Sequence, residues 1–188
     1  MIEELTRLNQ DSSEGDSSQK SPRRRQWQES FVSFALRVYG SEDFEELCLK
    51  LQNEYHANVN IILWCCWLEA EDISLSNMWL DEVLITIDTL TQLTVSRLQE
   101  VRKVIKDSSG FTKVQSKLIN KHILNAELTA EKIFLQRLQD TTMRFLEAEA
   151  FDPELHSKLS LEYYLGFLSM TEAPILAREL YGYSLNKP

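Results

Sequence analysis

Apolar side chains occupy every side of the segment Asn58–Leu68, and acidic residues flank this segment on both sides. A helix over residues 59–68 therefore has no polar face for about two turns. Such a helix has to be surrounded by other helices, so the run predicts the centre of a packed helical core. The apolar run has about ten residues, whereas a membrane span needs roughly 20.

Further helices are predicted on both sides of this core from apolar spacings of three and four residues. The first begins near Trp27 and ends at Gly40, and Ser41 then caps a second helix whose acidic first turn suits the helix dipole. Either Asn58 or Asn60 is expected to cap the core helix, and either Ser74 or Ser76 the helix after it. The threonines at 86, 89, 91 and 94 weaken helix propensity and predict a kink or break near 89–94, and residues 107–110 form a predicted turn. The expected buried residues of the first two helices are Trp27, Phe31, Phe34, Ala35 and Val38, then Phe44, Leu47, Cys48, Leu51 and Tyr55.

A long helix is predicted over residues 113–148, with two stripes of regularly spaced residues along it. Two stripes indicate contacts on two sides, either within the fold or across a homodimer. Asp152 and Pro153 then predict the start of C-terminal helices over residues 152–182. The first stripe contains Leu128, Glu131, Leu135, Leu138, Thr142 and Phe145, and the second contains Ile119, Ile123, Ala126, Ala130 and Ile133.

Length and composition agree with an all-α fold. The 188 residues suffice for one domain with a sizeable core, and only five Gly and four Pro interrupt them. We therefore expect a single compact bundle of about six to eight helices over residues 26–188, with core helices at 26–70. The polar residues 1–25 are expected to form a disordered tail, because they cannot bury enough apolar surface to offset their chain entropy.

The cysteines and the N-terminus favour a cytoplasmic protein. Three cysteines, at positions 48, 65 and 66, are an odd number and form no disulfide framework, which indicates a reducing compartment. The acidic N-terminus is followed by no long apolar stretch, so neither a signal peptide nor a membrane anchor is expected.

Charge is divided unevenly along the chain, whose net charge is −9. Residues 26–96 hold twelve acids and two bases, whereas residues 97–144 hold ten bases and five acids. This second block contains a candidate basic surface, made of Arg97, Arg102, Lys103, Lys106, Lys113, Lys117 and Lys121. It either complements the acidic first half, within the fold or across a dimer, or binds RNA, DNA or an acidic protein. Complementarity is the favoured interpretation, because charged runs usually form solvated faces and few aromatic residues accompany these bases.

No motif for catalysis, metal binding or a cofactor is present. The three histidines, at 56, 122 and 156, form no pair at ligand spacing, and no nucleophile elbow or phosphate loop occurs. Glu127 and Glu131 share a helix face but lack the Glu-x-x-His partners of a di-metal bundle, so they are interpreted as a salt-bridged outer face near Lys121 and Lys132. The aromatic residues Trp27, Tyr55, Trp64 and Trp67 are expected in the core, with a ligand pocket as the alternative.

Three segments between residues 31 and 68 carry a family resemblance. They are Phe31-x-x-Phe34-Ala35-Leu36-x-x-Tyr39, Cys48-Leu49-x-Leu51-Gln52-x-Glu54 and Val59-Asn60-Ile61-Ile62-Leu63-x-Cys65-x-Trp67-Leu68. This pattern resembles an uncharacterised proteobacterial family of small helical proteins, a domain of unknown function. The resemblance implies a bacterial cytoplasmic origin and transfers no catalytic residue.

The polar members of this pattern, Gln52, Glu54 and Asn60, form a candidate polar corner. Polar groups beside a fully apolar helix need hydrogen-bond partners, so the favoured interpretation is a locked corner, with a functional pocket as the alternative. For the whole chain we expect a non-enzymatic interaction or regulatory protein that binds a protein partner through helical surfaces. The alternatives are a nucleic-acid- or ribosome-associated factor that uses the basic surface over 97–121, and a small-molecule-binding helical protein.

Overall fold

The computed structural model describes residues 28–148 and 160–185, and their regular structure is α-helical, which confirms the all-α prediction. The predicted tail over residues 1–25, Trp27 and the helix start at Asp152 and Pro153 lie outside the described residues. The described helices are α2 (Phe31–Tyr39), α3 (Glu42–Tyr55), α4 (Val59–Ala70), α5 (Asn77–Leu93), α6 (Val95–Asp107), α7 (Lys113–Ala148), α8 (Ser160–Phe167) and α9 (Ala173–Leu185).

Helix α4 forms the centre of the fold, as its lack of a polar face predicts. Its residues from Ile61 to Leu68 are all buried, and α2, α3, α7, α8 and α9 all contact it. The indole NH groups of its two tryptophans find partners inside the protein: Trp64 Nε1 donates to Thr142 Oγ1 (2.9 Å) and Trp67 Nε1 to the Glu29 carbonyl oxygen (2.9 Å). Both rings are fully buried in the core, as the sequence predicts. Tyr55 is instead 44% exposed, so its expected burial is wrong.

Side-chain caps mark several of the helix starts. Ser30, Asn58 and Ser76 each accept a hydrogen bond from a backbone NH in the first turn of α2, α4 and α5. Ser41 stands at the N-cap of α3 but accepts no such bond. The predicted break falls at Thr94, between α5 and α6, where the Thr94 hydroxyl donates to the Leu90 carbonyl oxygen (2.6 Å).

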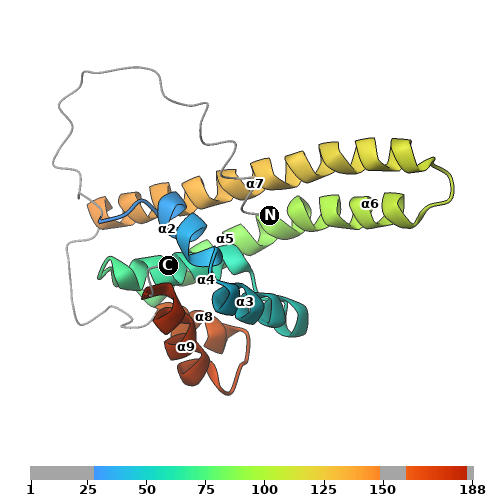
Figure 1. The fold of residues 1–188 in the computed structure, drawn as a ribbon. Helices are drawn as coiled ribbons and strands as arrows, with labels where there is room; N and C mark the ends of the chain where they lie inside the picture. The colour runs from blue at the N-terminus through green and yellow to red at the C-terminus, as the bar shows by residue number, and fades with distance from the viewer. Residues whose placement is uncertain (1–27, 149–159, 186–188) are drawn as a thin grey trace, which may run out of the picture.

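Helix α7 has 36 residues and two halves with different surroundings. The C-terminal half packs on the body of the molecule and buries the first predicted stripe, from Leu128 to Phe145. The N-terminal half pairs with α6 as an antiparallel hairpin that projects from the body (Figure 1). Between residues 96 and 126 no side chain is fully buried, so this hairpin is a thin two-helix layer.

The C-terminal helices close the body on the other side of α4. Helix α8 packs on α4, and α9 packs on α3, α4 and α8. The Tyr164 hydroxyl of α8 accepts a hydrogen bond from the Asn58 backbone NH (2.7 Å), which ties α8 to the start of α4. Among the described residues, no helix is both long and apolar enough to cross a membrane.

Candidate functional site: a basic hairpin and a polar pocket

The turn that joins α6 to α7 is held by local hydrogen bonds. The Thr112 hydroxyl accepts from the Gln115 backbone NH (3.3 Å), and the Gln115 side-chain oxygen accepts from the Thr112 backbone NH (3.0 Å). This reciprocal pair is a capping box, and it satisfies NH groups that a helix start leaves free. The Ser116 hydroxyl also donates across the hairpin to the Ile105 carbonyl oxygen (3.1 Å). The tip is thus a defined structure.

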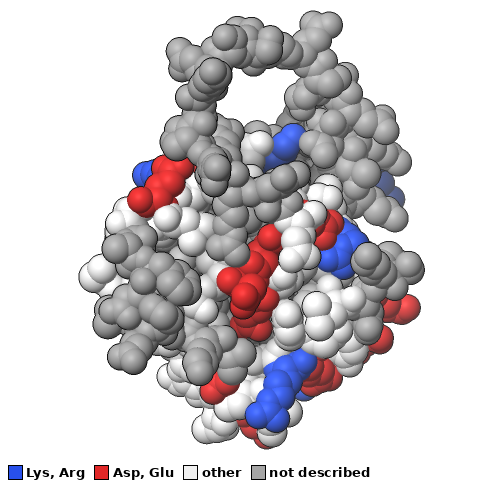
Figure 2. Space-filling view, turned by 90° about the vertical axis from the view of Figure 1, so that its left-hand side faces the viewer, with Lys and Arg blue, Asp and Glu red and all other residues white. Residues whose placement is uncertain are grey.

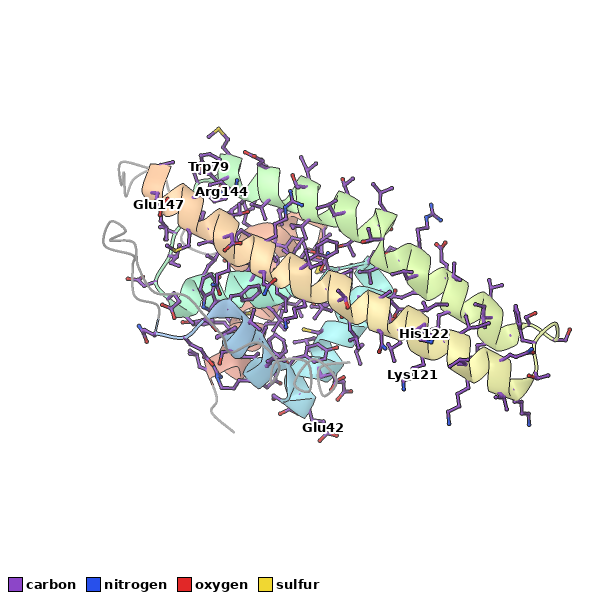
Figure 3. All side chains as sticks on the ribbon, turned by 90° about the horizontal axis from the view of Figure 1, so that it is seen from above. Glu42, Trp79, Lys121, His122, Arg144 and Glu147 are labelled. Carbon is purple, nitrogen blue, oxygen red and sulfur yellow. The ribbon has the colours of Figure 1, made fainter. Side chains whose placement is uncertain are left out.

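Five lysines of the predicted basic surface are exposed on this hairpin. On each helix of the hairpin, the lysines lie a short rotation past the side that contacts the other helix. The direction of this rotation along the chain is the same for Lys103 and Lys106 on α6 as for the three lysines on α7. In an antiparallel pair these two flanks lie on the same side, so the five residues share one face, here called the lysine face. Figure 3 shows Lys121 and His122 on the projecting half of α7, far from Arg144 and Glu147 at its other end. The lysine face consists of Lys103, Lys106, Lys113, Lys117 and Lys121.

The two arginines of the predicted basic surface make ion pairs instead. Arg97 pairs with the exposed Glu100 in the next turn of α6 (2.9 Å). Arg102 donates through Nε and Nη2 to both carboxylate oxygens of Glu127 (2.9 and 3.0 Å), and the Glu127 side chain is only 4% exposed. Arg102 is therefore a structural contact at the root of the hairpin, where a two-pronged arginine bond fixes the position of α6 on α7.

The interpretation of Glu127 and Glu131 as an outer face is wrong, because that side of α7 is covered in the fold and both residues are buried. Burial and the neighbouring Glu127 carboxylate raise the pKa of Glu131 from 4.5 to about 7, although Arg102 opposes the shift. Glu131 of the first predicted stripe and the neighbouring Glu127 thus contact the interior, together with one arginine from α6.

Exposed aliphatic side chains accompany the lysine face. Val114 is 78% exposed and Leu118 57% exposed, and both lie on α7 next to lysines in the sequence. On α6, Val101 and Val104 are also exposed, toward the opposite flank. A projecting element with this many exposed apolar residues is typical of a protein-binding surface.

The predicted polar corner is divided by the structure. Gln52 and Asn60 line a pocket of about 560 Å³, whereas Glu54 is exposed and lies outside its lining. The lock at this corner is made by Asn58, whose side chain donates to Thr91 Oγ1 (3.0 Å) and accepts from the Asn60 backbone NH (3.1 Å). Its position directly before the apolar run is the sequence signal for that role.

The other pocket residues come from distant parts of the chain. The wall carries the carboxylates of Glu45, Asp88 and Glu131 and the buried ring of Tyr39. Burial raises the pKa of Tyr39 above its ordinary value, and partial removal of the Asp88 carboxyl from water raises the pKa of that group as well. No regular spacing joins these residues, so sequence reasoning missed them.

The three cysteines lie in the interior of the described part of the chain. Cys48, Cys65 and Cys66 are free and buried, and burial raises the pKa of each thiol. A thiol in such surroundings is a poor nucleophile. Within residues 28–148 and 160–185, no three His, Cys, Asp or Glu side chains are placed to hold a metal ion.

These observations define an all-α protein with a projecting basic hairpin and a polar pocket at its root. The chain belongs to a family of proteins of unknown function, DUF2390, whose model matches residues 30–138. The expectation from residues 31–68 that the chain belongs to an uncharacterised domain family is therefore confirmed. The matched segment contains the whole hairpin and every residue that lines the pocket, but not α8 or α9. No curated protein and no solved structure matches the chain.

Proposed function

We propose that this protein is a non-enzymatic interaction module that binds an acidic protein partner through the lysine face and the neighbouring aliphatic residues Val114 and Leu118. The observation that carries the proposal is the composition of the hairpin. Residues 95–126 contain seven bases and two acids, and both arginines and Glu100 are engaged in ion pairs. The five lysines have no carboxylate within ion-pair distance among the described residues.

The apolar content of the surface favours a protein over a nucleic acid. Val114 and Leu118 would gain nothing from a phosphate backbone, but they fit the apolar side of an amphipathic helix. Nucleic-acid surfaces commonly interleave bases with aromatic residues, and here Phe111 is the single aromatic residue in residues 95–126.

The remaining charge of the molecule supports a directional encounter. At the end of the body opposite the hairpin tip, a group of acidic residues lies near the centre of the visible face, with basic residues around it (Figure 2). An acidic partner would be repelled from that end and attracted to the lysine face, because opposite charges steer association. We propose that this binding occurs in the bacterial cytoplasm, in line with three free buried cysteines.

The test is affinity capture from a bacterial lysate at low salt, with and without nuclease. The bait is the wild type, the variant Lys113→Glu/Lys117→Glu/Lys121→Glu, or a control with the same charge change on exposed residues elsewhere, Lys50→Glu/Arg144→Glu/Arg178→Glu. We expect one protein to survive nuclease, to be lost with the hairpin variant and to be retained by the control. Binding should also weaken as salt rises.

Two outcomes would overturn the proposal. Recovery that disappears on nuclease treatment would make the lysine face a nucleic-acid surface. Equal capture by the hairpin variant and the control would place the contact elsewhere. Self-association is checked by light scattering, where a mass of 21.9 kDa at every concentration excludes a homodimer through α7.

A further inference from the structure

We propose that the pocket at the root of the hairpin binds a small organic cation that carries a primary ammonium group. This site is separate from the lysine face, and the proposal does not rest on the protein-binding function. Its evidence is the shape of the pocket, the charge of its wall and the depth of one carboxylate.

The pocket is a product of the whole helical fold. Its volume of about 560 Å³ falls within the range of roughly 300–1,000 Å³ that small-molecule sites occupy. Each helix from α2 to α7 contributes to the wall, so the hairpin and the body meet around it. One wall residue from each helix, in chain order, is Tyr39, Glu45, Asn60, Asp88, Ser96 and Glu131.

The charge of the wall selects a cation. Among the described residues, three carboxylates line the pocket and no Lys or Arg side chain does, although the hairpin beside it is strongly basic. Arg102, which acts electrostatically on Glu131, donates two hydrogen bonds to Glu127. Side-chain amides and hydroxyls from the corner and from α5 and α6 add neutral hydrogen-bonding groups. An anionic ligand would be repelled here, whereas an ammonium group would be attracted.

Glu131 gives the pocket a fixed point for that ammonium group. Its side chain lines the pocket and is more than nine-tenths buried, with 9% of its surface exposed. The buried Tyr39 ring lines the same pocket, and both Glu45 and Glu131 act on its hydroxyl electrostatically. A carboxylate at this depth binds a donor more strongly than an exposed one, because little water competes.

The ligand class is an organic amine and not a metal ion. Divalent cations need several oxygen ligands that converge on one point. Within the described residues no three His, Cys, Asp or Glu side chains converge in this way, even though three carboxylates share the pocket. Carboxylates spread over a pocket of this size suit a ligand that is several atoms long.

The experiment is isothermal titration of the full chain with 1,4-diaminobutane at pH 8 and 150 mM salt. The neutral analogue 1,4-butanediol and Mg²⁺ are titrated in parallel. We expect saturable binding of the diamine with one site, and no binding of the diol. Glu131→Gln should weaken binding about tenfold or more, since a charge-assisted bond is lost, and Asp88→Asn should weaken it to a smaller extent.

Glu54→Gln is the matched control, because Glu54 is an exposed carboxylate on α3 outside the pocket, and its affinity should equal that of the wild type. The proposal would be overturned by the absence of saturable diamine binding, by equal affinity for the diol, or by the same loss of affinity in Glu54→Gln as in Glu131→Gln. Mg²⁺ binding that displaces the diamine would also contradict the proposal, because the ligand of the pocket would then be an inorganic cation. Folding of each variant is checked by circular dichroism, and Asp88→Asn, at an exposed position, keeps the test valid if Glu131→Gln is perturbed.

Discussion

The position of Glu131 is unfavourable for stability but favourable for binding in the pocket. It belongs to the buried stripe of α7, so folding removes a carboxylate from water next to a second carboxylate, Glu127. Glu127 is compensated by the two bonds from Arg102, which stabilise the root of the hairpin. A residue that costs stability when ionised, yet lines a pocket, is a common feature of binding sites.

This position predicts a pH-dependent effect of Glu131→Gln on stability. The pKa of Glu131 is raised in the folded protein, from 4.5 to about 7, so the folded state holds the proton more tightly than the unfolded state does. The wild type therefore loses stability as the pH rises from about 4.5 to about 7. Glu131→Gln should have the stability of the wild type near pH 4.5 and exceed it at pH 8 by about 3 kcal/mol at most.

Urea unfolding at both pH values measures this difference. Glu54→Gln is the control, because its exposed side chain should give no such pH-dependent gain. A stability difference for Glu131→Gln that does not change with pH would contradict the raised pKa.

At the scale of single elements, helix starts in this fold differ in how their first NH groups are satisfied. The Ser30 hydroxyl accepts from the Ser33 backbone NH (3.2 Å) at the start of α2. Ser41 occupies the equivalent position of α3 and makes no such bond, while three acidic residues in the first turn interact with the helix dipole. The same residue type therefore stabilises one helix as a cap and not the other.

The two serines provide a matched pair of substitutions. Ser30→Ala should lower the free energy of unfolding by about 1 kcal/mol, the usual cost of losing an N-cap, and Ser41→Ala by no more than a few tenths. Equilibrium urea unfolding with equal m-values measures both. An equal cost for the two variants would show that the Ser30 bond does not stabilise α2.

At the scale of the whole molecule, stability is distributed unevenly between the body and the hairpin. Nine of the twelve residues of α4 are buried, whereas none of residues 96–126 is. Helix α7 crosses both regions and has a buried stripe only from Glu127 onward. The hairpin can therefore open or adapt without unfolding of the core.

Hydrogen exchange should reveal this gradient along α7. We expect backbone amides of residues 116–124 to exchange at least about 100-fold faster than those of residues 130–142, because opening the hairpin exposes little apolar surface. Since both segments belong to one helix, helix propensity is an internal control. Uniform protection along α7 would contradict the division into body and hairpin. Protein binding to the lysine face should slow exchange in the hairpin selectively.

Several features of this protein were predictable from the sequence, because they depend on local chemistry. The absence of a polar face on residues 59–68 predicted α4 at the centre, and uninterrupted spacing predicted the helix over residues 113–148. The threonines predicted a kink or break near residues 89–94, and the structure has it at Thr94. The lysines on α7 were predictable as a stripe because four-residue spacing puts side chains on one side of a helix.

Only the tertiary structure decided which predicted faces are covered. The spacing of Glu127 and Glu131 puts them on one face of α7 but does not reveal whether that face is exposed or buried. They are buried because α6 and the body pack against that side of α7. Arg102 was predicted in the basic surface but is paired in the structure for the same reason, because its partner Glu127 is 25 residues away in the sequence. The pocket likewise exists only where six helices converge, and its carboxylates come from residues 45, 88 and 131. Local sequence determines where a helix begins and ends and which of its faces is apolar. Contacts between distant segments determine which polar side chains are removed from water.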